Sequence, residues 1–511
     1  MKGFIKMSFL NKIYIPIMLT ILLVGCSKST DIELPLSSTN EEAKNLYRGA
    51  QSAWAENNGP KGRDMMEKVL SLDPDFILAN LYVPTNDPNK WQEYRDRAQR
   101  NSENGNDHEK ISVKLWIAAR EGRSDDYINL CKDLVSKYPN SSEAYVELGN
   151  AYTGIEDFDK AIENYKKAID INPDQYNAWR GLASHEVTFG GNTLLPKNKQ
   201  SKKAALQYAK GMVKARPDAP FSYQAKGNIE RQYGDMDAAR TQYEKMTEAA
   251  IKANHSQGAG YNLIAHTYLF SGDYENAKKN YLLASKNAPN DWSRYSYGEF
   301  GLWSYLYEGD YKGALNAADD LEKKLMTYDL SEAQILDRRA GLQFNRFLAH
   351  AYNQNKSGAY DAMRANWRIR QDRLNMNKIK DEISEEGYQR FNAWMESWYY
   401  VLFGDYTRAQ KSLDNLYKLS SKRKTQGALD NYNALSGMVS LFTGDPEKAV
   451  SQFATIEKEN NLYYAYFKGL AYEGISENEK AQSIFTFIAN YNFQGWEPGL
   501  VRNLAKAKVS S

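Results

Sequence analysis

The sequence is poor in cysteine and histidine and carries almost no net charge. It has 2 cysteines and 5 histidines among 511 residues, and 66 lysines and arginines stand against 64 aspartates and glutamates. Two cysteines exclude a disulfide-stapled scaffold and a cysteine-based metal cluster, and five scattered histidines argue against any other metal site. Because no basic excess remains to neutralise a phosphate backbone, we expect no nucleic-acid partner.

The sequence patterns of common enzyme classes are missing as well. It contains no H-E-x-x-H zinc motif, no G-x-S-x-G nucleophile elbow, no P-loop and no dinucleotide fingerprint beyond the isolated Gly258-Ala259-Gly260. We therefore expect a protein that is not an enzyme and has no catalytic residue, metal or cofactor. A hydrolase would require acids that converge on a histidine such as His185 or His266.

What the chain has is length and tyrosine. Hydrophobic residues make up 42% and charged residues 25%, which is typical of a folded protein. A chain of 511 residues is too long for one compact core, so several domains or a repeat array are expected. Aromatic residues reach 13%, including 37 tyrosines, and this excess requires an explanation.

The first 25 residues have the pattern of a secretory signal. Basic residues precede the apolar run 13–23, which is too short to span a bilayer comfortably. The run leads into Leu23-Val24-Gly25-Cys26, which resembles the bacterial lipobox. The resemblance implies that residues 1–25 are removed and that Cys26 is acylated and anchors the chain to a membrane. The alternatives are an ordinary signal peptide and a buried cysteine.

The resemblance also implies a location. Ser27 follows the cysteine, and the absence of aspartate there favours the outer membrane, on its periplasmic or surface face. Residues 26–39 are short and polar, which suits a lipidated tether. Thr39 and Glu42 are predicted to form the capping box that opens the first helix.

The rest of the chain repeats with a period near 34 residues. In the clearest unit, Ser142–Gln175, a first helix carries Gly149 and Tyr152 and a second carries Ala161 and Tyr165. The unit resembles the tetratricopeptide repeat, a helix-turn-helix of about 34 residues. The alanine of the second helix recurs along the chain, and glycine and aspartate stand before five of its copies, at 234–235, 272–273, 309–310, 404–405 and 444–445.

The resemblance implies an all-α superhelical solenoid of roughly ten to twelve helix pairs with a C-terminal capping helix. The expected divisions are degenerate repeats at 40–140, a repeat array at 142–328, one stretched repeat at 329–387, a second array at 388–495 and the capping helix at 496–511. In that helix, Leu500, Val501 and Leu504 are predicted to face the solenoid, and Arg502 is predicted to lie on the opposite side.

In this family the first helix of each pair lines a concave groove that binds ligand. By that resemblance, the expected partner-binding side chains are first polar and then aromatic. They are Asn150, Arg180, Asn228, Arg231, Gln232, Asn262, His266, Trp303, Tyr307, Trp394 and Trp398. Polar groups of this kind suit peptide carbonyls and carboxylates, and exposed aromatic rings suit an apolar partner. The alternatives are that Asn150 belongs only to the repeat consensus and that the tryptophans are buried.

Together these features predict a non-enzymatic, lipid-anchored scaffold. It would bind a protein or peptide partner, such as an envelope protein, in its concave groove at a bacterial envelope membrane. The alternative is a surface lipoprotein that captures glycans or nutrients for an outer-membrane uptake system, because such proteins also contain helices of this kind.

Overall fold

The computed structural model describes residues 31–56, 58–85, 88–186, 194–376, 382–423, 425–458 and 461–510. These residues form 25 α-helices, one short 3₁₀ helix at Lys197–Lys199 and no strand. Cys26 and the rest of the predicted signal lie outside the described residues. Within the described ranges, no helix combines the length and apolarity needed to cross a membrane.

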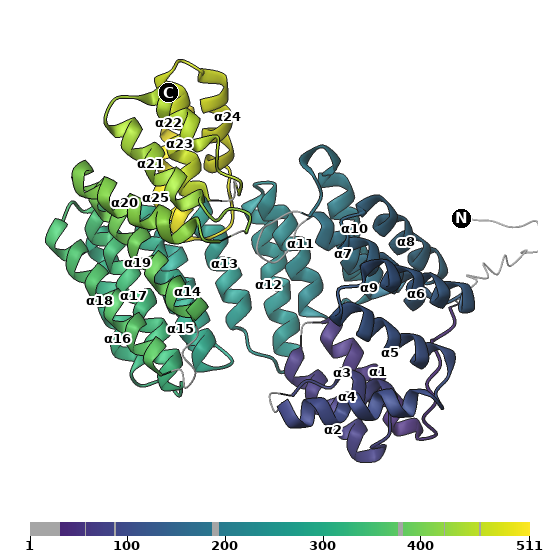
Figure 1. Cartoon of the computed structure of the whole chain (residues 1–511). Helices are drawn as coiled ribbons and strands as arrows, with labels where there is room; N and C mark the ends of the chain where they lie inside the picture. The colour runs from purple at the N-terminus through teal and green to yellow at the C-terminus, as the bar shows by residue number, and fades with distance from the viewer. Residues whose placement is uncertain are drawn as a thin grey trace, which may run out of the picture.

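The helices follow one another in two lobes joined by a central section (Figure 1). The N-terminal lobe contains α1 (Glu41–Ala55), α2 (Gly59–Leu72), α3 (Ile77–Tyr82), α4 (Pro88–Ser102), α5 (Asp107–Arg120), α6 (Ser124–Lys137), α7 (Ser142–Gly154), α8 (Phe158–Ile171), α9 (Tyr176–Glu186) and α10 (Lys202–Ala215). The central section contains α11 (Pro220–Gln232), α12 (Met236–Lys252) and α13 (Gly258–Ser271). The C-terminal lobe contains α14 (Tyr274–Lys286), α15 (Asp291–Glu308), α16 (Tyr311–Leu325), α17 (Glu332–Tyr352), α18 (Lys356–Asn375), α19 (Glu382–Leu402), α20 (Tyr406–Ser420), α21 (Asp430–Phe442), α22 (Pro446–Phe453), α23 (Leu462–Gly474), α24 (Asn478–Ala489) and α25 (Trp496–Ser510).

Consecutive helices pack as antiparallel pairs, α1 with α2 through α23 with α24, and α25 follows the last pair. These twelve pairs and the final helix confirm the all-α solenoid expected from the sequence. The stretch between α16 and α19 holds the single long pair α17 and α18, of 21 and 20 residues.

The glycine-aspartate steps make the turns within the pairs. Gly234 and Gly272 both have φ of 85°, a left-handed conformation that glycine adopts without a steric penalty. The aspartate that follows is the N-cap of the second helix: Asp235 accepts a hydrogen bond from the Ala238 backbone N–H at 3.0 Å. The same arrangement recurs before α14, α16, α20 and α22. The dipeptide therefore ends one helix and begins the next.

Tyrosine rings of the second helices pack against glycines of the first helices. Tyr165 on α8 is 2% exposed. A β-carbon placed at Gly149 on α7 would lie 2.7 Å from this ring, and one placed at Gly181 on α9 would lie 2.5 Å from it. Tyr243 has the same relation to Gly227, at 2.4 Å. A ring seated between two successive first helices accounts for part of the tyrosine excess.

The N-terminal segment folds across the lobe it begins. The Ile32 backbone N–H donates to the Asn140 carbonyl at 2.9 Å, and Asp31 accepts from the Ser142 backbone N–H at 2.8 Å. The predicted capping box at Thr39 is wrong by one residue. Asn40 is the N-cap of α1 and accepts from the Ala43 backbone N–H at 3.1 Å, because the chain turns into the helix only after it has crossed α5 and α7.

The last helix is held on two sides. Helix α25 packs against α23 and α24 and also against α15, which lies far away in sequence. Leu500 and Val501 are buried as predicted, but Arg502 is 4% exposed and Leu504 is 46% exposed, so the prediction of which of these last two faces the solenoid is reversed. A terminal capping helix has one face exposed to solvent, whereas α25 packs between α23 and α24 on one side and α15 on the other.

We predict that Gly149→Ala destabilises the N-terminal lobe by about 1–3 kcal/mol, because the new methyl group has to displace the Tyr165 ring. Gly154→Ala is the matched control on the same helix, since nothing lies within 4 Å of its β-carbon position. It should be neutral or stabilising by up to ~1 kcal/mol. Thermal unfolding followed by circular dichroism measures both, and equal midpoints for the two variants would contradict this account of the packing.

Candidate functional site

The concave faces of α11, α13 and α15 are covered by the chain's own C-terminal segment. Between α24 and α25 the chain runs through residues 491–495 without helical structure. Asn492 donates through Nδ2 to the Arg231 carbonyl at 3.1 Å. Arg502 donates to Asn492 Oδ1 at 2.8 Å and to the Phe270 carbonyl at 3.3 Å. This segment occupies the place that the sequence assigns to a partner.

Arg231 lies at the centre of this contact. Its guanidinium carbon is 4.4 Å from the centroid of the Phe493 ring, and its Nη1 donates to His266 Nδ1 at 2.7 Å. Burial, reinforced by the Arg231 charge, holds the pKa of His266 well below its usual value. His266 is therefore a neutral acceptor. No carboxylate among the described residues bonds to either side chain, so the acid that a hydrolase at His266 would require is not found there.

Several predicted groove residues are therefore buried rather than exposed. Asn228 is 3%, Arg231 2%, Asn262 8% and His266 3% exposed, and the expectation of an open groove is wrong at these four positions. Gln232 is half-buried. Four side-chain atoms have no hydrogen-bond partner within the described structure: Arg231 Nε, Gln232 Oε1, Asn262 Oδ1 and His266 Nε2. The covering segment thus leaves polar groups unsatisfied.

The tryptophan-rich patch is a core. Trp398 is completely buried, and its Nε1 donates to the Tyr463 hydroxyl at 3.0 Å. Trp394 is half-buried and donates to the Tyr464 hydroxyl at 2.7 Å. Trp496 at the start of α25 lies 5.5 Å from Trp398, ring to ring. Because α25 and α23 cover these rings, the expectation that they form an exposed aromatic groove is wrong.

The other two aromatic candidates are also engaged. Trp303 is half-buried and its Nε1 donates to Asn345 Oδ1 at 3.0 Å. Tyr307 is 2% exposed and packs edge to face on Phe270 at 6.0 Å. Neither presents a free ring to a partner.

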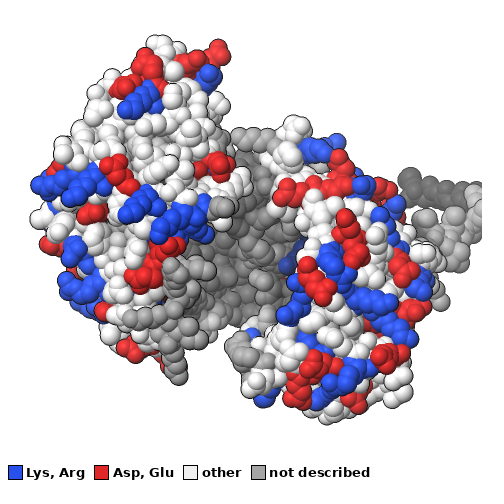
Figure 2. All heavy atoms as spheres, in the orientation of Figure 1, with Lys and Arg blue, Asp and Glu red and all other residues white. Residues whose placement is uncertain are grey.

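The N-terminal lobe, in contrast, contains a cavity of about 960 Å³ that is open to solvent. It is bounded by the segment 33–36, by α1 and by α7, with further lining from α2, α5 and α6. A second cavity of about 430 Å³ shares Gln51, Trp54, Val146, Glu147 and Asn177 with the first. We call the two together the N-terminal cavity. On the outer face of this lobe in Figure 2, acidic and basic side chains intermingle.

Helix α1 closes the N-terminal cavity from one side. Ala55 at its end packs in one cluster with Tyr176, Met212 and Phe221, which belong to α9, α10 and α11. Arg216, just after α10, forms an ion pair with Glu56. The superhelix therefore turns tightly enough to bring its first helix against its fifth and sixth pairs.

Two glutamates one helical turn apart on α7 face this cavity. Burial raises the pKa of Glu143, although the Leu34 backbone N–H hydrogen-bonds to its carboxylate. Burial, reinforced by Glu143, raises the pKa of Glu147 to about 7. The structure shows no hydrogen bond or ion pair from the Glu147 carboxylate to any described residue. Glu147 is thus a charge without a partner, set against a cavity.

The groups that face Glu147 from other helices are neutral. The Glu147 charge acts electrostatically on four such groups: Tyr47 on α1, Tyr82 at the end of α3, and Tyr127 and Cys131 on α6. Burial raises the pKa of all four above its usual value, so they stay protonated near neutral pH. The rings of the three tyrosines also line the cavity.

Two of the basic groups that line the cavity, Arg48 and Arg216, have acidic partners. Arg48 forms an ion pair with Glu33 at 2.7 Å. Arg216 is paired with Glu56 and also donates to the Ser52 hydroxyl at 2.7 Å. Arg63, on α2, is exposed to solvent. The Arg48 charge also favours the ionised form of Glu143, whereas no described cation acts in this way on Glu147.

Two predicted partner-binding residues line the smaller cavity. Asn150 is exposed, and its Oδ1 accepts from the Tyr165 hydroxyl at 2.8 Å. Arg180 lies with its guanidinium 5.3 Å from the Phe221 ring. His185 contacts the Thr153 hydroxyl at 2.9 Å, and burial lowers its pKa to about 4. A role of Asn150 and Arg180 in partner binding stays a prediction.

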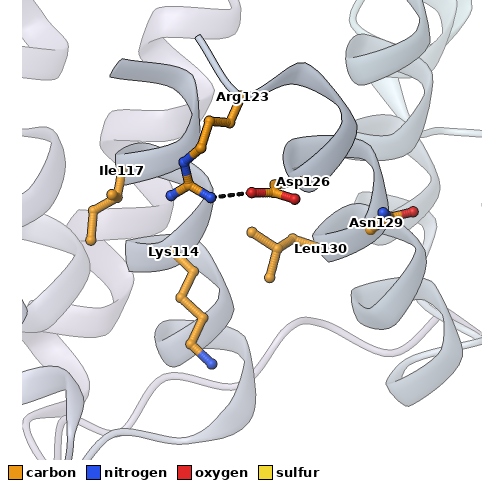
Figure 3. A pocket seen from close by; sticks show the side chains of 6 residues that line it. All are labelled: Lys114, Ile117, Arg123, Asp126, Asn129 and Leu130. Carbon is orange, nitrogen blue, oxygen red and sulfur yellow. Dashed lines mark hydrogen bonds and ion pairs between the residues drawn. The ribbon is translucent and has the colours of Figure 1, made fainter. Parts of the chain in front are cut away.

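Other hollows carry less chemistry. Figure 3 shows the one between α5 and α6, about 460 Å³ in volume, where Arg123 and Asp126 pair with each other. A further hollow, between the end of α20 and the start of α21, is lined mainly by polar side chains. No group of three or more His, Cys, Asp or Glu side chains in the described ranges is placed to hold a metal ion.

The comparisons with known proteins identify the repeat. Residues 142–175 and 259–291 each match the tetratricopeptide repeat family, so the chain contains tetratricopeptide repeats. A stretch of 67 residues is 36% identical to superkiller complex protein 3 of Homo sapiens, covering 13% of this chain and 4% of that protein. A stretch of 121 residues is 28% identical to mitochondrial import receptor subunit TOM70 of Mus musculus, covering 23% of this chain and 18% of that protein.

The chain was also compared with solved structures. A tetratricopeptide repeat protein from Parabacteroides merdae aligns with a TM-score of 0.33 and 18% identity, over 53% of this chain and 92% of that one. The likeness to the curated relatives is confined to small parts of their length, 4% and 18% of the two named above.

Sequence reasoning found part of the N-terminal cavity and missed its centre. It named Asn150 and Arg180, which line the smaller cavity, but not Glu147 or the tyrosines around it. The signal for Glu147 was its spacing of four residues from Glu143 on the first helix of the clearest repeat. Tyr47 and Tyr82 gave no such signal, because they reach the cavity from degenerate repeats through the closure of the lobe.

We predict that Phe493→Ala loosens the C-terminal segment, because the ring is 5% exposed and packs on Arg231. Loss of a buried phenylalanine costs about 3–5 kcal/mol. Hydrogen exchange of residues 491–503 should accelerate, while α1 to α8 exchange as before. Phe487→Ala is the control, since that ring is 45% exposed. Unchanged exchange in the Phe493 variant would mean that the segment is not held by this contact.

Proposed function

We propose that the protein is a lipid-anchored tetratricopeptide repeat scaffold that holds a protein or peptide partner at a bacterial envelope membrane, the outer membrane being favoured. The observation that carries the proposal is the N-terminal cavity, a concave, solvent-open and charged space among repeat helices. The repeats support a role in protein interaction, because arrays of this kind present such concave surfaces to partners.

The binding site is the N-terminal cavity rather than the central groove. The groove of α11, α13 and α15 is already filled by residues 491–495 and α25, and its key side chains are buried. In the N-terminal cavity, Asn177 is exposed and lines both compartments. A partner segment can reach this cavity without displacing a described part of the chain.

The anchor fits this choice. Asp31 is fixed to α7 by hydrogen bonds to Ser142, and the segment that follows lines the cavity. Cys26 lies five residues earlier, so its acyl chains would be attached within about 18 Å of Asp31 even in a fully extended chain. A lipid on Cys26 would therefore hold the cavity close to the membrane. Confinement to that surface raises the effective concentration of membrane partners.

The test of the anchor is Cys26→Ser. Expressed in a Gram-negative bacterium, this variant should leave the membrane fraction and appear in the soluble fraction, because a thioether to lipid can no longer form. Fractionation and immunoblotting measure it, with Cys131→Ser as the control that should remain in the membrane. Retention of the Cys26 variant in the membrane would refute lipid anchoring.

The test of the cavity is a crosslink formed in cells. A photoreactive residue at Asn177 should capture a partner segment, whereas one at Lys166, exposed on α8 outside both cavity linings, should not. Mass spectrometry identifies the captured protein. If neither site yields an adduct while an oligosaccharide binds saturably, the scaffold proposal fails and the nutrient-capturing alternative replaces it.

A further inference from the structure

The charge pattern of the N-terminal cavity selects the chemistry of its occupant. Glu143 and Glu147 lie on one face of α7, and Glu147 has no partner among the described residues. Glu147 is half-buried and Glu143 is exposed, and both line the cavity. A charge in such a place is costly unless an opposite charge approaches it. The occupant that supplies this charge is a cation.

The lining also suits an organic cation rather than a metal ion. Tyr47, Trp54, Tyr82 and Tyr127 line the same space as Glu147. Aromatic faces attract ammonium and guanidinium groups, and they contribute most where the site is desolvated. A hard metal ion would need several oxygen ligands, whereas here no group of three potential ligands gathers in the described ranges.

The volume of the two compartments determines what size of occupant they can admit. The two compartments, about 960 and 430 Å³, are large enough for a basic side chain together with the backbone that carries it. Asn177 and Arg180 in the smaller compartment can hydrogen-bond to peptide carbonyls. A side chain bound at Glu147 would therefore leave its backbone near polar groups that can fix it.

We propose that the N-terminal cavity binds a basic side chain of the partner, a lysine or an arginine, with Glu147 as the carboxylate that receives its charge and the tyrosines as its apolar walls. This inference rests on the proposed function, since it takes the occupant to be a segment of a protein partner. The same chemistry could come from a free small amine, and the experiment separates the two.

The test is isothermal titration calorimetry of the full chain in detergent with three probes. These are a capped peptide with a single lysine, the same peptide with glutamine in its place, and n-butylammonium, which is the lysine side chain alone. The lysine peptide should bind saturably and the glutamine peptide at least tenfold more weakly. Equal affinity for both peptides would overturn the proposal. Binding of butylammonium without the lysine peptide would also overturn it, because the occupant would then be a free amine.

The matched variants are Glu147→Gln and Glu163→Gln. The first removes the carboxylate in the cavity, and the second removes one that pairs with Lys167 on the outside of α8 at 2.9 Å. Glu147→Gln should weaken the lysine peptide at least tenfold, and Glu163→Gln should leave it unchanged. Circular dichroism checks that both variants fold. Unchanged binding in the Glu147 variant would overturn the site, while a crosslinked partner at Asn177 would leave the scaffold itself standing.

Acidity provides a second readout. The pKa of Glu147 is raised to about 7, so its carboxylate is ionised at pH 8 and mostly protonated at pH 6. Affinity for the lysine peptide should fall by about tenfold over this range in the native chain and stay level in the Glu147→Gln variant. The proposal requires that affinity falls with pH in the native chain and that this fall is absent in the Glu147→Gln variant.

Burial shifts the pKa values of the tyrosines, the thiol and the histidines around Glu147 away from this window. Tyr47, Tyr82, Tyr127 and Cys131 have raised pKa values, and Tyr165 on α8 has a raised pKa as well. The pKa of His185 is lowered to about 4, and that of His108 at the cavity wall is also lowered by burial. Glu143 shares the helix and has a raised pKa, so the double variant with Glu143→Gln separates its share. A pH dependence that survives in the double variant would overturn the assignment.

Discussion

The packing of an aromatic ring of a second helix against a glycine of a first helix is the contact on which the rest of the structure depends. Tyr165 fills the space left by the missing side chains of Gly149 and Gly181, which belong to successive first helices. Because protein interiors are close-packed, this contact fixes how closely and at what angle one repeat follows the next. Repeated along the chain, small fixed rotations between neighbours add up to a superhelix.

The superhelix is tight enough for both ends of the chain to return to it. At the N-terminus, α1 packs beside α9 to α11 and leaves a cavity between itself and α7. At the C-terminus, residues 491–495 and α25 fill the corresponding space against α11, α13 and α15. The N-terminal part of the superhelix therefore surrounds the N-terminal cavity, whereas the C-terminal part surrounds residues 491–495 and α25. For this reason the proposed partner site is the N-terminal cavity.

Features set by neighbouring residues in the sequence could be predicted. Contacts between segments that are far apart in the sequence could not. The dipeptide Gly234-Asp235 predicts both the turn and the N-cap of the next helix, and the structure contains both. Arg231 is predicted to line an open groove, but it is buried against Phe493, which is 262 residues away. Trp398 is buried by α25 for the same reason. No periodicity within a repeat encodes such contacts.

The two closures also treat their buried charges differently. Arg231 has no carboxylate partner, yet the Phe493 ring and a neutral His266 receive its charge and one of its N–H groups. Glu147 has a negative neighbour, Glu143, and neutral phenol groups around it. No described cation pairs with its carboxylate. An uncompensated buried ion opposes folding by several kcal/mol. A cation bound at Glu147 in the folded lobe would offset this cost, so occupancy of the cavity would stabilise the lobe. The N-terminal lobe is then most stable when its partner is present, which is a property that suits a scaffold.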